Sequence, residues 1–582
     1  MATRHPSPLA GPPPSRSRPQ PASRLRRLAP LLAFATVAFG AGLLIGARHE
    51  PSERRLAASF TAAWERGDYA AMHALLSDAA RGEVSLRRFS RAYTRAAEVA
   101  TLTGVRAARP REGGDDEVEI DVSAATRIFG TITGRVVLGV QERADGTPGV
   151  MWRPEHVFPG LRGGERLRRE TRMPPRAAIQ SRDGATIAEG EARLSGLGPL
   201  AAEVAGRIGP APPERAEELR RRGVPAETPV GLTGLERAFD ERLAGTPGGT
   251  LRAGSRMLAS SEPRPGGAVR TTIDPEVQEA AVTALAGRFG GIAVMRPSDG
   301  EVLALAGIAY SAPQPPGSTF KIVTLAGLLD AGLVERSERF PVQTSTTLEG
   351  VELENANGEA CGGSLRASFA ESCNSVFAPL GARLGAERLV ATAEKFGFNE
   401  EPGLAGAARS TIPAAAEVGD DLAVGSTAIG QGKVLATPLL MADVASAIAQ
   451  GGRRPRPTLL KGAGGVAGRA TTPETARFIA RAMRSVVTDG TGAGAAVPGV
   501  RVAGKTGTAE LRDTVDDAPP LPGQPLQEED ITDTDAWFTA FAPLREPKVA
   551  VCVLLVGQGA GGATAAPAAQ TVIQAALTSR GG

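Results

Sequence analysis

The sequence places two of its few lysines beside hydroxyl-bearing residues. Only six of the 66 basic residues are lysine, and none of the six precedes position 321. Lys321 follows Ser318 by three residues, and Lys505 opens a Lys-Thr-Gly-Thr run. A buried lysine can lose its proton and act as a base, whereas arginine stays charged in a protein. The rarity of lysine therefore indicates that these two positions need lysine chemistry rather than a plain positive charge.

Other catalytic groups are scarce in the same part of the chain. All four histidines lie within the first 156 residues, so the rest cannot build a Ser-His-Asp triad or a histidine-ligated metal site. The cysteines are too few for a four-cysteine zinc site, and they are Cys361, Cys373 and Cys552. We therefore expect no metal or other cofactor. A nucleophile here needs a base other than histidine.

The region around Ser318 predicts a helix that brings the hydroxyl and the amine together. Pro315-Pro316-Gly317 cannot continue a helix, so a helix that contains Ser318 should begin there. Residues three apart share a helix face, which places Ser318 beside Lys321. Buried positions are then expected along one stripe, at Ile322, Leu325 and Leu329.

Two further motifs follow in the chain. Ser372-Cys373-Asn374 lies near predicted helix ends, and Lys505 lies on an apparent strand at 500–510. The glycine of the Lys-Thr-Gly run lets a substrate backbone approach that strand closely. Each motif alone is weak, but the three in this order form a specific signal.

Composition and length bound the remaining organisation. A chain of 582 residues has room for three or four domains, and its net charge of +3 does not suggest nucleic-acid binding. Residues 1–27 hold six arginines, seven prolines and no acid, which predicts a disordered basic cytoplasmic tail. Residues 28–47 carry no charge and are long enough for a transmembrane helix.

The arginines before this span predict that the N-terminus is cytoplasmic and that the remainder is extracellular or periplasmic. A cleaved signal peptide is the alternative, because small residues end the span. The span is longer than a usual signal core, so an uncleaved single-pass anchor is favoured.

Three domains are expected beyond the anchor. Residues 51–160 combine a helical stretch at 54–97 with strands and form a small α+β domain, interpreted as a spacer or docking domain. The strands predicted for this domain lie at 117–123, 128–140 and 149–157. The following pedestal module, 161–265, is predicted to contain helices at 213–222 and 234–244. For the third domain, 266–582, the predicted strands lie at 292–295, 302–305, 537–542 and 549–556. The long helical stretch between these strands predicts that the first and last strands meet in one sheet.

The three motifs, taken together, resemble those of the class B penicillin-binding proteins, the peptidoglycan D,D-transpeptidases. Further family-like stretches support the resemblance, although Ala177 stands where the family usually has glycine; they are Pro175–Ile179, Arg182–Gly184, Gly231–Glu236, Thr272–Gln278, Gly430–Gly432 with Thr437-Pro438, and Trp537-Phe538. Residues 54–160 resemble the NTF2-like domain of the resistance-associated branch. The resemblance implies a multidomain α/β (α+β) fold whose transpeptidase domain has a mainly antiparallel sheet flanked by helices.

The resemblance also implies the roles of the site residues. Ser318 is the nucleophile acylated by a D-Ala-D-Ala stem peptide, and Lys321 is the neutral base. Ser372 relays a proton to the leaving nitrogen, while Asn374 orients the base and the donor amide. Lys505 keeps the base neutral and binds the terminal carboxylate, together with the strand residues Thr506, Gly507 and Thr508.

The implied partners are peptidoglycan stem peptides, β-lactams, a glycosyltransferase supplied by another protein, and the machinery of elongation or division. The competing functions are a D,D-carboxypeptidase, a β-lactamase, and a non-catalytic β-lactam sensor or cell-wall scaffold. Intact motif residues weigh against a non-catalytic role.

Two local features leave alternatives open. Cys361 and Cys373 could form a bridge that pins the loop of Ser372, or they could be two unpaired buried residues. Residues 513–535 hold eight acidic residues and no basic one, which is typical of a solvated loop, or of a rim that tunes substrate access.

Overall fold

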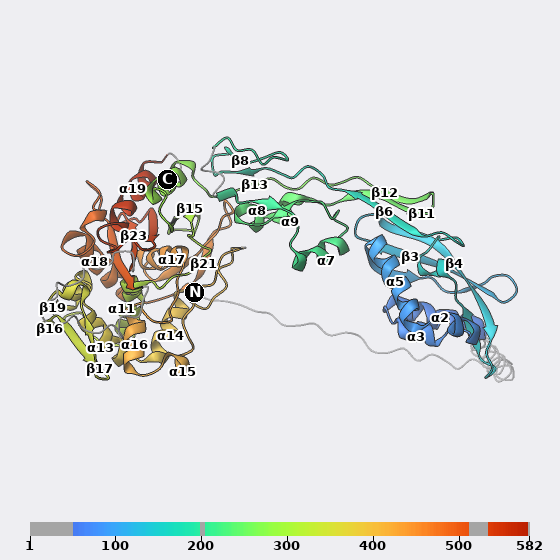
Figure 1. Ribbon diagram of the computed structural model, residues 1–582, viewed down its shortest axis with the longest axis horizontal. Helices are drawn as coiled ribbons and strands as arrows, with labels where there is room; N and C mark the ends of the chain where they lie inside the picture. The colour runs from blue at the N-terminus through green and yellow to red at the C-terminus, as the bar shows by residue number, and fades with distance from the viewer. Residues whose placement is uncertain (1–50, 198–203, 405, 511–533, 580–582) are drawn as a thin grey trace, which may run out of the picture. The chain divides into compact units, whose positions relative to one another are not determined.

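The computed structural model describes residues 51–197, 204–404, 406–510 and 534–579, which divide into two compact units (Figure 1). The first contains residues up to 168 together with 251–259, and the second contains 169–250 and everything from 260 onward. The predicted tail, the predicted membrane span and nearly all of the acidic segment 513–535 lie outside the described residues. Within the described ranges, no helix has both the length and the apolarity needed to cross a bilayer.

The first unit begins with four helices where the sequence predicted one helical stretch. They are α2 (Ser52–Glu65), α3 (Tyr69–Ala74), α4 (Asp78–Glu83) and α5 (Leu86–Ala100). A polar side chain accepts a backbone N–H at the start of each of the last three, namely Asp68, Ser77 and Ser85. Such N-caps begin a new helix by satisfying its free donors, so they divide the stretch.

An antiparallel sheet completes this unit, with strand order β1-β3-β4-β5 and β2 paired to β3. The strands are β1 (Leu102–Ala107), β2 (Arg111–Glu112), β3 (Glu117–Thr126), β4 (Gly130–Glu142) and β5 (Pro148–Met151). Alternate residues of β3 are buried, as its sequence predicted. The strand predicted at 149–157 is wrong beyond Met151, because Pro154 lacks a ladder donor and begins the 3₁₀ helix η2 (Pro154–Val157).

Short strands and helices follow. The strands are β6 (Leu167–Arg172), β7 (Ile179–Gln180), β8 (Thr186–Ala188), β9 (Ile208–Gly209), β10 (Val230–Gly231), β11 (Gly248–Ala253), β12 (Arg256–Ser261) and β13 (Val269–Arg270). The helix predicted at 213–222 is present as α7 (Pro213–Arg221). The one predicted at 234–244 is two helices, α8 (Gly234–Ala238) and α9 (Asp240–Ala244), which meet at Phe239.

A five-stranded antiparallel sheet organises the rest of the second unit. Its strand order is β15-β14-β24-β23-β22. The bounds are β14 (Gly290–Met295), β15 (Val302–Gly307), β22 (Ala503–Glu510), β23 (Thr534–Ala542) and β24 (Val549–Leu555). The prediction that the first and last strands share one sheet is confirmed by the pairing of β14 with β24.

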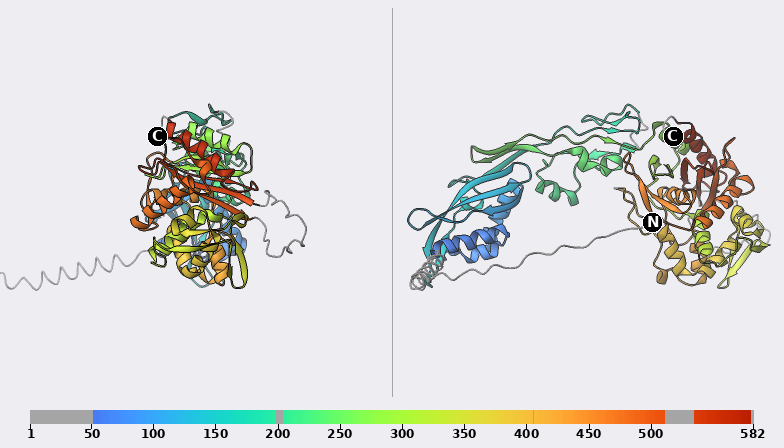
Figure 2. Two further views of the ribbon diagram at one scale, coloured as in Figure 1. Left: turned by 90° about the vertical axis from the view of Figure 1, so that its left-hand side faces the viewer. Right: turned by 180° about the vertical axis from the view of Figure 1, so that it is seen from behind.

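Helices cover both faces of this sheet (Figures 1 and 2). One face packs on α10 (Pro275–Leu285) and α19 (Ala565–Thr578), and the other on α17 (Pro438–Ala449) and α18 (Pro473–Thr488). Residues of β24 alternate between the two cores: Val551 and Val553 face the first layer, whereas Cys552 and Leu554 face the second. Burial on both faces explains why the strand is apolar throughout.

The remaining elements lie between β15 and β22. They are η3 (Gly317–Phe320), α11 (Lys321–Asp330), β16 (Arg339–Gln343), β17 (Ser345–Leu348), β18 (Val351–Glu354), η4 (Ala356–Gly358), β19 (Cys361–Ser364), α12 (Leu365–Ala370), α13 (Asn374–Leu384), α14 (Ala386–Lys395), α15 (Ala415–Val418), α16 (Asp421–Ala428), β20 (Arg453–Arg456), β21 (Gly465–Arg469) and η5 (Ala493–Ala495).

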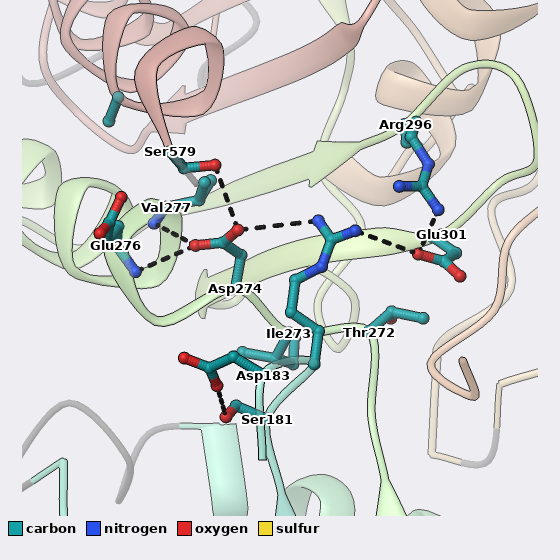
Figure 3. A network of polar contacts seen from close by, with 12 residues as sticks. Ser181, Asp183, Thr272, Ile273, Asp274, Glu276, Val277, Arg296, Glu301 and Ser579 are labelled. Atoms are coloured by element: carbon teal, nitrogen blue, oxygen red, sulfur yellow. Dashed lines mark hydrogen bonds and ion pairs between the residues drawn. The ribbon is translucent and has the colours of Figure 1, made fainter. Parts of the chain in front are cut away.

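A largely buried cluster of charged residues and one serine joins the family-like stretch at 182–184 to the start of this sheet (Figure 3). The guanidinium of Arg182 lies 3.6 Å from Asp274 Oδ2 and 3.7 Å from Glu301 Oε2. Ser579 donates to Asp274, and Arg296 forms a 2.5 Å contact with Glu301. We call these five residues the Arg182 cluster. Asp274 also caps α10, so the cluster fixes the helix that covers one face of the sheet.

Candidate active site

Ser318 lies on η3, one residue after Gly317, and Lys321 begins α11. Gly317 has a φ of +51°, and a Cβ there would lie 2.6 Å from the carbonyl oxygen of Thr508. Only glycine lets the backbone before Ser318 lie against β22 in this way. Every residue from Lys321 to Leu328 is buried, so α11 is enclosed on all sides rather than along the predicted stripe.

The Lys321 amine is fully buried and contacts the side chains of three of the other four predicted catalytic residues. Its Nζ lies 2.8 Å from Ser318 Oγ, 2.7 Å from Asn374 Oδ1 and 2.7 Å from the carbonyl oxygen of Ser372. Ser372 Oγ is further away, at 3.3 Å. Every one of these partners is a neutral oxygen atom. Among the described residues, no carboxylate forms an ion pair with this amine.

A tight turn between α12 and α13 carries Ser372, whose φ of +65° lies in the left-handed region. Asn374 donates from Nδ2 to the carbonyl of Glu354 at 2.9 Å, which turns its Oδ1 toward Lys321. The backbone N–H of Ser375 donates to Asn355 Oδ1 at 2.8 Å. These contacts hold a strained turn in one conformation. Sequence reasoning missed Asn355, because no local pattern relates it to a turn twenty residues later.

A disulfide also holds this turn. Cys373 stands between Ser372 and Asn374 and is bonded to Cys361 at the start of β19. Of the two alternatives that the sequence left open for these cysteines, the structure has the bridge. Cys552, the third cysteine, is buried and unpaired in β24.

Lys505 reaches the same turn from the opposite side. Its Nζ donates to Ser372 Oγ at 2.8 Å and to the carbonyl of Thr506 at 3.1 Å. It is fully buried like Lys321, so the hydroxyl of Ser372 lies between two buried amines. Thr506, Gly507 and Thr508 follow on β22, the edge strand of the sheet.

Burial lowers the pKa of both amines. Desolvation is the larger cause for Lys321, followed by repulsion from Lys505, and together they hold the pKa of Lys321 well below its usual range. Desolvation lowers the pKa of Lys505 to about 7. The rings of Phe377 and Phe369 lie 5.8 and 5.6 Å from the two amines and exclude water from them. A pair of like charges in a dry site favours loss of one proton.

Backbone contacts close the rear of the site. The N–H of Gly317 donates to the carbonyl of Gly430 at 2.9 Å, and a Cβ at Gly430 would lie 1.8 Å from the Gly317 oxygen. A Cβ at Gly507 would lie 2.9 Å from the Pro316 oxygen. The side facing solvent carries Ser318, Ser372, Asn374 and Thr508, all half-buried. The arrangement can therefore present an activated hydroxyl to a carbonyl group that enters from solvent.

Three family models match the chain. The penicillin-binding protein transpeptidase domain matches residues 290–574, and the penicillin-binding protein dimerisation domain matches 171–258. The NTF2-like N-terminal transpeptidase domain matches 52–165.

Curated relatives point the same way. The chain is 36% identical over 417 residues to peptidoglycan D,D-transpeptidase PbpA of Mycobacterium tuberculosis, an alignment that covers 59% of this chain and 79% of that protein. It is 35% identical to PbpA of Mycolicibacterium smegmatis, with the same two coverages.

Solved structures resemble the chain as well. The penicillin G acyl-enzyme complex of penicillin-binding protein A from M. tuberculosis has a TM-score of 0.55 and 28% identity, and the match covers 69% of this chain and all of that one. PBP2 of Pseudomonas aeruginosa in complex with WCK 5153 has a TM-score of 0.58 and 26% identity, and it covers 71% and 97%.

Proposed function

Because this chain belongs to the class B penicillin-binding proteins and is a serine D,D-transpeptidase that cross-links peptidoglycan and is acylated by β-lactams, we propose which of its residues carry the reaction. Ser318 is the nucleophile. Its Oγ attacks the carbonyl carbon of the penultimate D-Ala of a stem peptide, forms an ester, and releases the terminal D-Ala as an amine.

Lys321 is the general base for this attack. A neutral lysine has two N–H groups and one lone pair. The carbonyl of Ser372 and Oδ1 of Asn374 can only accept hydrogen bonds, so they take both N–H groups. The lone pair is then left for the hydroxyl of Ser318, whose oxygen lies 2.8 Å away. This fit between a neutral amine and its three partners is the observation that supports the proposal most strongly.

Ser372 passes the proton onward. Its Oγ lies 3.3 Å from the Nζ of Lys321 and 2.8 Å from the Nζ of Lys505. This hydroxyl faces the solvent side of the site, where the leaving group departs. The proton taken from Ser318 moves through this hydroxyl to the nitrogen of the departing D-Ala. In the second half-reaction, an acceptor amine attacks the ester, its proton returns along the same route, and Ser318 is released.

Lys505 and β22 bind the donor. The ammonium of Lys505, with Thr506 and Thr508, binds the terminal carboxylate, and Gly507 leaves room for the peptide backbone. The backbone N–H groups of Ser318 and Thr508 form the oxyanion hole, an effect worth about 3 kcal/mol per donor. The close packing of Gly317 on the Thr508 carbonyl supports this, because it brings the two backbones together.

Labelling with fluorescent penicillin tests the nucleophile. Wild-type protein should carry a covalent label after denaturation, and Ser318→Ala should carry none while keeping the same melting temperature. A Ser318-independent label would overturn the assignment. Turnover of a chromogenic β-lactam, or release of D-Ala without cross-linked product, would instead favour the β-lactamase or carboxypeptidase alternative.

The membrane anchor is also a proposal. Residues 28–47 are uncharged and follow three arginines, which supports a single-pass protein with a cytoplasmic N-terminus and a catalytic domain outside the membrane. A glycosyltransferase of the elongation or division machinery is the proposed partner that makes the glycan strands. Carbonate extraction tests the anchor: the full chain should stay with membranes, and a chain that starts at residue 51 should not.

A further inference from the structure

A threonine outside the three motifs contacts one of them and the segment that leads into another. Thr491 follows α18 in the glycine-rich turn Gly490–Gly494, a run that lacks the strand-to-helix context of a phosphate-binding loop. Its Oγ1 lies 2.5 Å from the Oγ1 of Thr506 on β22. Its N–H and its hydroxyl both point at the carbonyl of Ala370, two residues before Ser372, at 3.3 and 3.4 Å.

The glycines of this turn are required by its packing. A Cβ at Gly490 would lie 2.3 Å from the Ala370 oxygen, and one at Gly492 would lie 2.9 Å from the Phe538 ring. From the other side, a Cβ at Gly562 would lie 2.2 Å from the Thr491 oxygen. The turn is therefore fitted tightly between the segment that leads to Ser372 and the edge strand. Thr491 has a fixed place at this junction.

We propose that Thr491 is a positioning residue that orients the hydroxyl of Thr506 toward the carboxylate of the donor. In the free enzyme, Thr506 donates to Thr491, and Thr491 donates to the Ala370 carbonyl. A carboxylate can only accept hydrogen bonds. When it binds, the Thr506 hydrogen must turn toward it, and Thr491 then donates to Thr506 across the 2.5 Å contact. This inference rests on the proposed role of Thr506 in carboxylate binding.

The relay has a consequence for specificity. Thr491 supplies a donor to Thr506 when Thr506 donates to the ligand, and a carboxylate accepts a much stronger hydrogen bond than the carbonyl of an ester. Thr491 therefore supports ligands with a free carboxylate more than ligands whose carboxyl group is esterified. Its hydroxyl also polarises that of Thr506, which strengthens the bond to the anion. Thr491 contributes to recognition of the donor terminus without contacting it.

The test compares Thr491→Val with Thr491→Ser. Valine keeps the shape and removes the hydroxyl, whereas serine keeps the hydroxyl. The second-order rate constant of acylation by benzylpenicillin should fall about tenfold in Thr491→Val and stay within about threefold in Thr491→Ser. Acylation by the methyl ester of benzylpenicillin should change by less than about twofold in both. Thr488→Val, at the exposed end of α18, is the matched control and should match wild type.

A double-mutant cycle separates positioning from general damage to the fold. If Thr491 acts through Thr506, adding Thr491→Val to Thr506→Val should cost less than about twofold. An equal loss in both backgrounds, or an equal loss with acid and ester, would overturn the inference. A wild-type rate constant of acylation by benzylpenicillin in Thr491→Val would also overturn the inference. That result would leave the role of Ser318 intact, because the role of Ser318 fails only if Ser318→Ala is still labelled.

Discussion

Two of the groups of buried cations in the second unit differ in the atoms that surround them. In the Arg182 cluster, Arg182 lies between two carboxylates, those of Asp274 and Glu301. At the active site, Lys321 and Lys505 are surrounded by carbonyl, amide and hydroxyl oxygens. Carboxylates hold a cation in its charged form much more strongly than neutral oxygens do.

The difference separates a structural charge from a chemical one. Arginine is permanently charged in a protein, so Arg182 can hold segments together but cannot accept a proton. A lysine beside neutral oxygens, and next to another lysine, can be uncharged at neutral pH. This explains why a chain that otherwise uses arginine keeps lysine at positions 321 and 505.

The largest effect is expected from Lys321→Arg. The guanidinium retains charge and cannot accept a proton from Ser318, so the comparison predicts a loss of at least about 10³-fold in the acylation rate constant. Stopped-flow measurement with a fluorescent penicillin gives this rate. Acylation at the wild-type rate would contradict the role of Lys321 as base and remove the distinction between the two groups.

Arg182→Met tests whether the charge of Arg182 serves the stability of the fold rather than the reaction. Removing the guanidinium leaves two buried carboxylates with fewer partners, although Ser579 and Arg296 still contact them. We expect a loss of about 2–3 kcal/mol in the free energy of unfolding, measured in urea, with an unchanged acylation rate constant in the folded protein. Arg172→Met is the control, because Arg172 and Glu262 form an exposed pair worth less than about 1 kcal/mol. A large loss of acylation at unchanged stability would mean that the cluster serves the chemistry.

The pH dependence of acylation tests the other lysine. The rate constant should rise with pH as Lys321 loses its proton, because only the neutral amine is a base. It should fall above the pKa of Lys505, about 7, as the ammonium that binds the carboxylate disappears. The apparent values belong to the coupled pair. One pH unit above that pKa, a loss of about tenfold is expected for benzylpenicillin.

Lys505→Arg sharpens this pH experiment. Arginine keeps its charge at all these pH values, so the falling limb should disappear. The rate constant at its maximum should be lower than in wild type, because a guanidinium does not fit the fully enclosed position. A falling limb that persists in Lys505→Arg would assign it to another group.

Much of this site follows from local sequence, and the rest does not. The contact between Ser318 and Lys321 could be predicted because residues three apart share a helix face. The pairing of β14 with β24 could be predicted because apolar strands occur at both ends of the domain's sequence. Asn355 and Thr491 were missed because each contacts a segment remote in sequence, and neither contact leaves a periodic pattern. Such contacts exist only once the chain has folded.

The errors in the fold have the same origin. Apolar spacing predicted one helical stretch at 54–97 and one helix at 234–244, but caps and a break at Phe239 divide them. Periodicity shows which face of an element is buried, whereas a single capping residue or proline decides where the element ends. The disulfide could be proposed from two cysteines but not chosen from the sequence, because spacing alone does not fix the distance between them.

The smallest effect is expected at the four other lysines, and it tests the rule that burial among neutral oxygens is what makes lysine necessary. Lys395, Lys433, Lys461 and Lys548 are all exposed. Lys461 is the most demanding of them, because its Nζ donates to the carbonyl of Arg182 at 3.1 Å. Arginine can make that bond from a longer side chain, so Lys461→Arg should change stability by less than about 0.5 kcal/mol and acylation by less than about twofold. A tenfold loss of the acylation rate constant would show that an exposed lysine also takes part in the reaction. The contrast between buried arginine and buried lysine would then not explain the positions at which this chain has lysine.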